Sequence, residues 1–390
     1  MDICSVLPVE ILTYILSLTI DTNKLQNIHL INKLLNCIID EHIKPKNFKV
    51  LIIKKYPKLT DDLLSQLNYI RRLILGNVNN ITDNGIIPLN NLTSIVLNNN
   101  KYITDNSIRM LTNLTNIALM HNMLITNDGI KQLNKLTSLS LNSNRIITDD
   151  GIMLLTNLTY LNLNSNNNIT CHSLKGLIKL TTLYLNFTKV NKIQYDDGIK
   201  NLTNLTKLSI CATVGVTDDS LSRLTNLTCL ELYKNQIITD AAITNLTNLI
   251  ALNIYKCKYV SDFGIKKLSK LRSLFSSDNV TNSSISVLTN LNTLFLSKYI
   301  TNDTLENLIQ LTHLGVLNNI IITNESIIKL TNLTILNLYK NPNFTLNCIL
   351  KLTNLQTLRM HKKITRNFIG LNYKNRQTND FEFNMIKFIL

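Results

Sequence analysis

The sequence predicts an α/β solenoid, a coil in which one short strand and one short helical segment recur along the chain. Three observations predict it. About fifteen near-copies of one phrase fill most of the 390 residues, and they return at a regular period of about 22 residues. Each copy also holds only about six or seven apolar residues. Their burial contributes roughly 10–15 kcal/mol, whereas ordering one copy costs on the order of 30 kcal/mol, so a copy folds only against its neighbours.

The copies are aligned on their first apolar residue, and each reads L-x-x-L-x-L-x-x-N-x-x-I-T-D-x-G/S-I-x-x-L-x-x. They start at Phe48, Ile70, Leu92, Leu114, Leu136, Leu158, Leu180, Leu205, Leu227, Leu249, Leu271, Leu291, Leu311, Leu333 and Leu355. The phrase L-x-x-L-x-L-x-x-N is the signature of the leucine-rich repeat. We therefore expect a leucine-rich-repeat horseshoe of about 15 repeats over residues 48–376.

The elements of one repeat follow from its residue types. Leu161 and Leu163 alternate with polar residues, which predicts a short strand with one buried face. Asn166 comes where the strand ends, and its amide can bond backbone groups that the bend leaves unpaired. Thr170 is placed to cap the short helical segment that follows.

Three repeats depart from the period of 22. The repeat that starts at Leu180 has 25 residues, with extra material at 189–194, and those starting at Leu271 and Leu291 have 20. Length changes in solenoids collect in the loops of one face. We expect a bulge on one rim and a local change of curvature near Phe275 and Phe295.

The residues that follow the strand indicate which class of leucine-rich repeat this sequence resembles. Asn or Cys followed by x-x-I-T-D-x-G-I-x-x-L recurs as NKYITDNSIRML from Asn100, NQIITDAAITNL from Asn235 and CKYVSDFGIKKL from Cys257. This pattern resembles the cysteine-containing leucine-rich repeats of F-box proteins, and it covers about 330 residues. Chains of this kind also resemble F-box/leucine-rich-repeat proteins of giant DNA viruses of amoebae.

The first 45 residues do not repeat and predict two amphipathic helices, the first beginning near Pro8. From the pattern alone, they could simply cap the first repeat. However, L-P-x-E-I-L-x-x-I-L-x-x-L followed by a second helix resembles an F-box, although the chain lacks the Trp that this family often carries. The resemblance implies that residues 1–45 dock the Skp-type adaptor of a cullin–RING ubiquitin ligase. The implied adaptor-binding residues are Leu7, Pro8, Ile11, Leu12, Ile15, Leu16, Leu25, Ile28, Ile31 and Leu35.

The side chains expected on the concave face change along the array. In the early repeats they are small and polar, and from the middle onward aromatic residues and lysines take the fifth, seventh and eighth positions. Aromatic residues beside cations are typical of binding hot spots. We expect a target-binding surface made of Tyr184, Tyr233, Lys234, Tyr255, Lys256, Phe275, Phe295, Lys298, Tyr339 and Lys340. The alternative is that a Tyr-Lys pair was copied with the repeat and only covers strand edges.

No residue pattern predicts catalysis, a cofactor or a metal site. The six histidines are far apart, and the seven cysteines are scattered without a C-x-x-C pair, as expected of reduced thiols. The N-terminus lacks the features of a secretion signal, and no apolar run is long enough to cross a membrane. We expect a cytoplasmic or nuclear protein, or one in the host-cell cytoplasm for a viral chain.

The function implied is the substrate-recognition subunit of a Skp–cullin–F-box type ubiquitin ligase, binding a target protein on the concave face. One alternative is an interaction scaffold with no ligase link. A net charge of +15 also suggests a nucleic-acid-binding protein as a further alternative, although no recognised nucleic-acid-binding motif accompanies this charge. We expect residues 377–390 to cap the last repeat.

Overall fold

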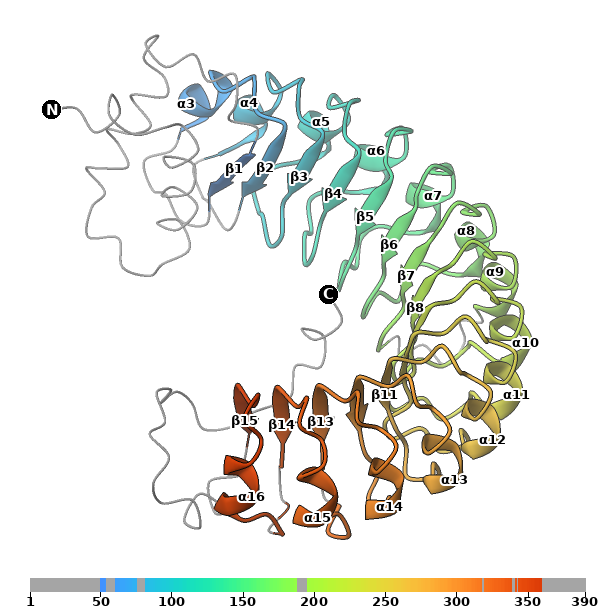
Figure 1. Cartoon of the computed structure of the whole chain (residues 1–390). Coiled ribbons are helices and arrows are strands. Elements are labelled where there is room, and N and C mark those ends of the chain that lie inside the picture. The colour runs from blue at the N-terminus through green and yellow to red at the C-terminus, as the bar shows by residue number, and fades with distance from the viewer. Residues whose placement is uncertain are drawn as a thin grey trace, which may run out of the picture.

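The computed structural model describes residues 50–53, 60–75, 81–187, 195–317, 319–338, 341 and 343–359. In these residues the repeats stack into an open arc, with the strands along its inner side and the helices along its outer side (Figure 1). The predicted leucine-rich-repeat horseshoe is confirmed. The adaptor-binding residues expected in 1–45 and the cap expected at 377–390 lie outside the described residues.

The described strands form one parallel sheet of fifteen, ordered as in the chain. Neighbouring strands pair one repeat apart, so that Leu161 lies beside Leu183. The strands are β1 Val50–Ile53, β2 Arg72–Leu75, β3 Ser94–Val96, β4 Asn116–Ala118, β5 Ser138–Ser140, β6 Tyr160–Asn162, β7 Thr182–Tyr184, β8 Lys207–Ser209, β9 Cys229–Glu231, β10 Ala251–Asn253, β11 Ser273–Phe275, β12 Thr293–Phe295, β13 His313–Gly315, β14 Ile335–Asn337 and β15 Thr357–Arg359.

The helices are single turns of four or five residues, too short to persist without packing. They are α3 Asp61–Ser65, α4 Asp83–Ile86, α5 Asp105–Ile108, α6 Asn127–Ile130, α7 Asp149–Ile152, α8 Cys171–Leu174, α9 Asp196–Ile199, α10 Asp218–Leu221, α11 Asp240–Ile243, α12 Asp262–Ile265, α13 Asn282–Ile285, α14 Asn302–Leu305, α15 Asn324–Ile327 and α16 Leu346–Leu350. Most begin after a Thr; the Thr170 hydroxyl, as predicted, accepts a hydrogen bond from His172 N at 3.1 Å.

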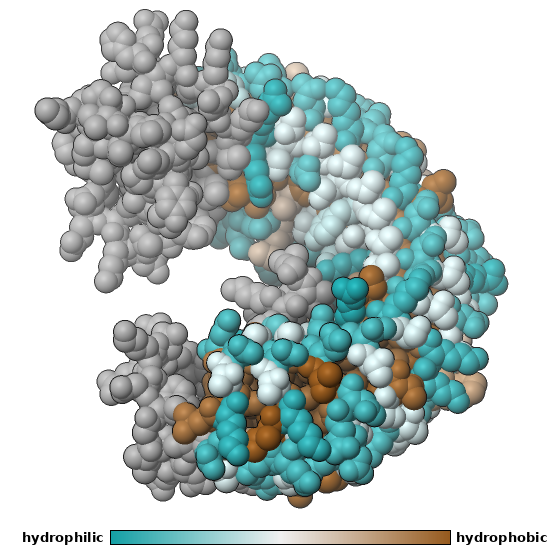
Figure 2. Space-filling view, viewed as in Figure 1, coloured by the Kyte–Doolittle hydropathy of each residue, from teal (hydrophilic) through white to brown (hydrophobic). Residues whose placement is uncertain are grey.

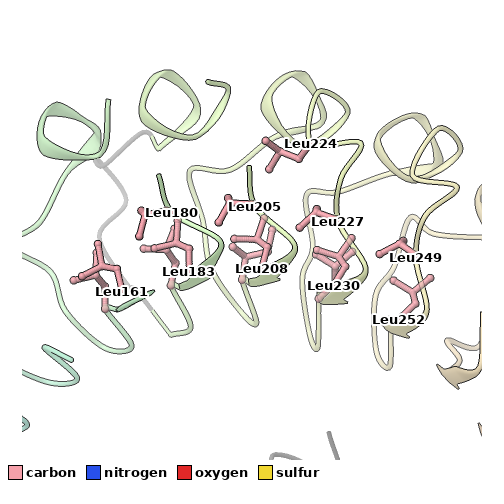
Figure 3. Packing of buried hydrophobic residues seen from close by; sticks show 14 of the residues in the cluster. Leu161, Leu180, Leu183, Leu205, Leu208, Leu224, Leu227, Leu230, Leu249 and Leu252 are labelled. Carbon is pink, nitrogen blue, oxygen red and sulfur yellow. The ribbon is translucent and has the colours of Figure 1, made fainter. Parts of the chain in front are cut away.

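The core is a continuous row of leucine and isoleucine between the strands and the helices. Leu161 and Leu163 are fully buried, which confirms the inward side predicted for them. In Figure 3, Leu161, Leu183 and Leu208 point from successive strands into the same layer. Each repeat therefore covers the apolar face of the next.

Buried asparagines join successive repeats where each strand ends. Asn166 donates from Nδ2 to the carbonyl oxygens of Leu141 at 3.3 Å and Asn144 at 2.9 Å, and its Oδ1 accepts from the amides of Asn168 and Ile169. This confirms the predicted role of the repeat asparagine.

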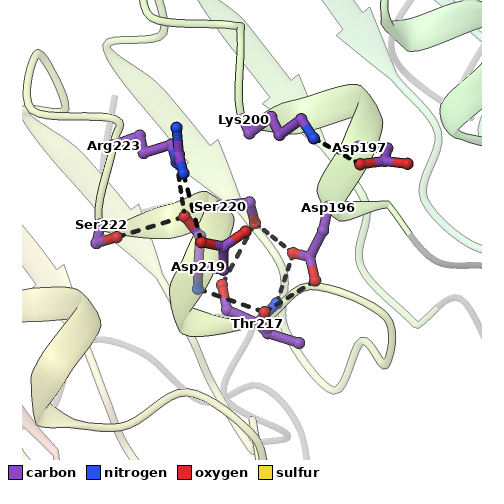
Figure 4. Close-up of polar contacts among 8 residues, drawn as sticks. All are labelled: Asp196, Asp197, Lys200, Thr217, Asp219, Ser220, Ser222 and Arg223. Atoms are coloured by element: carbon purple, nitrogen blue, oxygen red, sulfur yellow. Dashed lines mark hydrogen bonds and ion pairs between the residues drawn. The ribbon is translucent and has the colours of Figure 1, made fainter.

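Aspartates at the helix starts form a second line of links on the outer side of the arc. The Asp196 carboxylate accepts from Thr217 N at 2.9 Å, Thr217 Oγ1 at 2.8 Å and Ser220 Oγ at 2.5 Å (Figure 4). In some repeats Gly takes the place of that Ser, as at Gly264, which lies directly against Asp240. The T-D-x-G/S phrase thus encodes contact between repeats.

The two 20-residue repeats keep the sheet register and lose residues from the turn after the strand. Ser277 Oγ and Ser297 Oγ take the place of the repeat asparagine, donating to Val260 O and Val280 O, each at 3.1 Å. Lys298 follows Ser297 directly and is exposed. The inserted residues 189–194 lie outside the described residues.

Candidate functional site

The concave face is built from the two outer residues of each strand, because the middle residue points into the core. On β7, Leu183 is buried while Thr182 and Tyr184 are partly exposed. Parallel pairing in register then aligns equivalent positions of all repeats into rows along the arc. A feature that recurs in neighbouring repeats therefore becomes a continuous line on the surface.

Tyr233 and Tyr255 form one such line beyond the ends of β9 and β10. Their rings are 6.0 Å apart between centroids and nearly parallel, at 9°. The two rings therefore stack, at a separation wider than the usual strand spacing of about 4.8 Å. The rings follow the paired residues of the strands, so the hydrogen-bonded ladder does not set their separation.

The lysine that follows each tyrosine in the sequence lies above the ring of that tyrosine. Lys234 Nζ lies 5.0 Å from the centroid of Tyr233, and Lys256 Nζ lies 5.3 Å from that of Tyr255, within the range of a cation–π contact. Both lysines adopt positive φ, 58° and 62°, which turns each side chain back over the ring before it. Burial, with the neighbouring Tyr233 second, raises the pKa of Tyr255 above its ordinary value. We call these four residues the Tyr-Lys line.

Phe275 and Phe295 form a second aromatic pair on β11 and β12. Their rings stack at 4.3 Å and 11°. Phe275 is only 4% exposed, whereas Phe295 is partly exposed. The expectation that Phe275 itself contacts a target is therefore corrected: Phe275 supports Phe295, which carries the accessible ring surface.

A third cluster, on β6 to β9, includes four residues that the sequence analysis did not select. The Tyr160 and Tyr184 rings lie 5.8 Å apart, and Lys207 Nζ lies 5.5 Å from the Tyr184 centroid. Ser209 Oγ lies 2.6 Å from Glu231 Oε2. Burial alone would lower the pKa of Lys207, but its hydrogen bond to Tyr184 and its charge interactions with Tyr184, Cys229 and Glu231 together raise it. Tyr160 and Lys207 occupy the third repeat position. A comparison of the residues at this position across the repeats would have identified them.

The remaining expected site residues lie elsewhere. Lys298 is exposed, with Nζ 4.8 Å from the Tyr299 centroid and 3.6 Å from Asp278 Oδ2. Tyr339 and Lys340 lie outside the described residues. The inner surface of the arm that carries β11–β15 shows hydrophobic side chains among hydrophilic ones (Figure 2).

The described residues contain no group of three or more His, Cys, Asp or Glu side chains placed to hold a metal ion. None of the helices in the described part of the chain could cross a membrane. The five cysteines within the described ranges carry free thiols. The chemistry that this surface offers is therefore stacking, cation–π contact, hydrogen bonding and ion pairing.

No protein-family model and no curated protein matches the chain. Among solved structures, a leucine-rich-repeat protein from Leptospira interrogans has a TM-score of 0.59 at 25% identity, covering 82% of this chain and 85% of that one. An internalin from Listeria monocytogenes has a TM-score of 0.52 at 20% identity, with 83% and 92% covered. The TLR13–ssRNA13 complex has a TM-score of 0.51 at 21% identity, with 79% and 49% covered. These likenesses agree with the leucine-rich-repeat solenoid described above.

Proposed function

We propose that the chain is the non-catalytic substrate-recognition subunit of a Skp–cullin–F-box type ubiquitin ligase. In this proposal the concave side of the repeats binds a target protein, and residues 1–45 bind a Skp-type adaptor. The observation that carries the target-binding half is the Tyr-Lys line, with two stacked rings and an ammonium group over each. Ubiquitin transfer itself belongs to other subunits of the complex.

The Tyr-Lys line suits a protein partner for two physical reasons. Tyrosine offers a large, stiff contact surface at low entropic cost, and the stacking of Tyr233 on Tyr255 fixes that surface before a partner arrives. The lysines are exposed and add positive potential to a chain of net charge +15, which favours encounter with acidic segments. The preferred target segment is therefore apolar and acidic.

The adaptor-binding half rests on the resemblance of residues 1–45 to an F-box, and those residues lie outside the described part of the chain. In the proposal Ile11 and Ile15 lie on the apolar stripe of the first helix and contact the adaptor. A ligase of this kind works in the cytoplasm or nucleus. For a viral chain, the place would be the cytoplasm of the host cell.

The experiments described below also distinguish two alternative functions. An interaction scaffold would bind a target without binding an adaptor. A nucleic-acid protein would bind single strands, since bases also stack on tyrosines beside cations. Glu231 stands against the nucleic-acid alternative, because its carboxylate lies in the row between Tyr184 and Phe275 and would repel a phosphate backbone.

The target-binding half is tested in two steps. Capture from a eukaryotic lysate on the full chain identifies a target, and its affinity is then measured for two triple variants. Tyr233→Ala/Tyr255→Ala/Phe295→Ala should weaken binding by about thirtyfold or more, since truncating a hot-spot ring costs about 2 kcal/mol or more. The control triple Ser138→Ala/Ser140→Ala/Asn162→Ala, on β5 and β6, should change it little. A reversed ranking of the two triples would place recognition elsewhere on the arc.

The adaptor-binding half is tested with purified Skp-type adaptor. Ile11→Lys/Ile15→Lys should abolish its capture and leave target affinity unchanged, because these residues precede the repeats in the sequence. Equal capture by wild type and variant, or none by either, would remove the ligase link and leave the scaffold. Tight binding of a single-stranded oligonucleotide that the aromatic triple abolishes would favour the nucleic-acid alternative.

A further inference from the structure

The Tyr-Lys line carries two positive charges that no described carboxylate neutralises. The ion pairs among the described residues involve Lys131, Lys175, Lys200, Arg223, Lys298 and Lys329. Lys234 and Lys256 lie instead over their own tyrosine rings, with their side chains exposed. The line therefore fits a segment that pairs carboxylates with apolar side chains.

The chain contains such a segment. Residues 380–390, DFEFNMIKFIL, lie outside the described residues and begin with two carboxylates alternating with two phenylalanines. Seven of these eleven residues are apolar, so the segment gains free energy wherever it can leave water. It is the only place in the sequence where acidic and aromatic residues alternate in this way.

The spacing of this segment matches the spacing of the rings. In an extended chain, alternate side chains lie on one face about 6.6–6.8 Å apart. Phe381 and Phe383 would then present two rings at almost the 6.0 Å separation of Tyr233 and Tyr255. Asp380 and Glu382 would face away from the rings, so Lys234 and Lys256 must swing off their tyrosines to reach these carboxylates.

The segment can also reach the Tyr-Lys line. From β15 to β9 there are six strand spacings, about 29 Å along the arc. The twenty residues between Arg359 and Asp380 span up to about 70 Å when extended. A tether of this length holds the segment at an effective concentration of the order of millimolar, so weak contacts suffice to seat it.

We propose that residues 380–390 bind in cis to the Tyr-Lys line. Phe381 and Phe383 pack on the tyrosine rings, and Asp380 and Glu382 pair with Lys234 and Lys256. The segment then covers the surface assigned above to the target, and a target must displace it. Only this last consequence rests on the proposed function.

The test uses the full chain, which has no Trp. Phe383→Trp introduces a single indole into the segment, and its emission wavelength and quenching by acrylamide report its exposure to water. In this background, Lys234→Glu/Lys256→Glu should shift the emission to longer wavelength and increase quenching. Adding Asp380→Lys/Glu382→Lys to that variant should restore both signals, because the charges are exchanged. The control Lys266→Glu/Lys267→Glu makes the same change of net charge in and just after the C-cap of α12, and should alter neither signal.

The proposal would be overturned if Lys234→Glu/Lys256→Glu left the emission wavelength and the quenching unchanged. It would also be overturned if adding Asp380→Lys/Glu382→Lys did not restore the two signals. A segment that packs on the last repeat, or stays in solvent, gives the first of these results. Thermal unfolding monitored by circular dichroism shows whether each variant keeps its fold. The assay contains no target. A negative result would therefore refute binding of the segment in cis without bearing on the proposed function, which is tested separately.

Discussion

The ring of Phe295 lies across Gly315 and occupies the space that a β-carbon on Gly315 would need. The two residues are direct partners in the register of β12 and β13. On its other side Phe295 stacks on Phe275. A missing side chain on one strand thus fixes the position of the aromatic pair on the two strands before it.

Gly315→Ala should therefore push the Phe295 ring aside and break the stack. We expect a loss of about 1–3 kcal/mol of unfolding free energy, the usual cost of inserting a methyl group into a packed site, and weaker target binding. Urea unfolding measures the first effect. Gly176→Ala is the matched control, because a β-carbon there meets nothing closer than 3.8 Å. An equal change in the two variants would contradict the assigned role of Gly315.

The aspartate links between repeats predict a sharp difference between two substitutions at one site. Asp196→Ala leaves three donors of the next repeat without their acceptor and should cost about 2–4 kcal/mol. Asp196→Asn should cost far less, because other repeats use Asn at this place. Asn282, for example, accepts from Thr301 N and donates from Nδ2 to Thr301 Oγ1 at 2.7 Å. Chemical denaturation of both variants measures the difference, and equal losses would show that the links do not depend on an acceptor.

The same links predict sensitivity to acid. Burial raises the pKa of Asp262, but hydrogen bonds from Ser284, Thr281 and Ser283 together outweigh it and hold that pKa below its ordinary value of 3.8. A carboxyl group with a lowered pKa in the folded chain stabilises it above the unfolded pKa, and this contribution is lost as pH falls through the folded value. Unfolding free energy should therefore fall below about pH 4. Asp262→Asn should flatten that fall, as measured by denaturation at several pH values; an unchanged slope would assign the acid sensitivity to other groups.

Much of this fold was predictable because one repeat dictates both its strand and its contacts. The inward leucines, the buried asparagine and the capping threonine follow from residue type and period. What the period could not reveal is how far a ring is covered by its neighbour: Phe275 and Phe295 hold the same repeat position, yet only Phe295 keeps accessible surface.

The buried cysteines should resist alkylation. Burial raises the pKa of Cys211 and of Cys257 to about 12 and that of Cys229 to about 11. At pH 8 a thiol of pKa 12 is ionised in roughly one molecule in ten thousand, and the thiolate is the reactive form. Mass spectrometry after iodoacetamide treatment should find these three residues unmodified in the folded chain and modified in urea. Rapid labelling of the folded chain at Cys211 would contradict its buried position.

The raised thiol pKa values also set a direction for alkaline stability. A group whose pKa is higher in the folded chain stabilises it below the unfolded pKa, about 9 for these thiols, and loses that contribution as pH rises towards 11–12. Replacing Cys211 and Cys257 with Ala should therefore weaken the decline of unfolding free energy above pH 9. An equally steep decline in the double variant would show that other groups cause it.

The last prediction tests the dependence of each repeat on its neighbours. Leu161 is fully buried on β6, between Leu139 of β5 and Leu183 of β7. Leu161→Ala leaves a cavity that two neighbouring strands share, and should cost about 2–5 kcal/mol. Because contacts in a solenoid run only between neighbours, the loss should open the array locally, and limited proteolysis should cut near the middle. Leu154→Ala is the control, since Leu154 is 64% exposed on the outer side; it should change neither stability nor cleavage. If Leu161→Ala lowers stability with no new cleavage site in the middle repeats, the array unfolds as a single unit and the local picture is wrong.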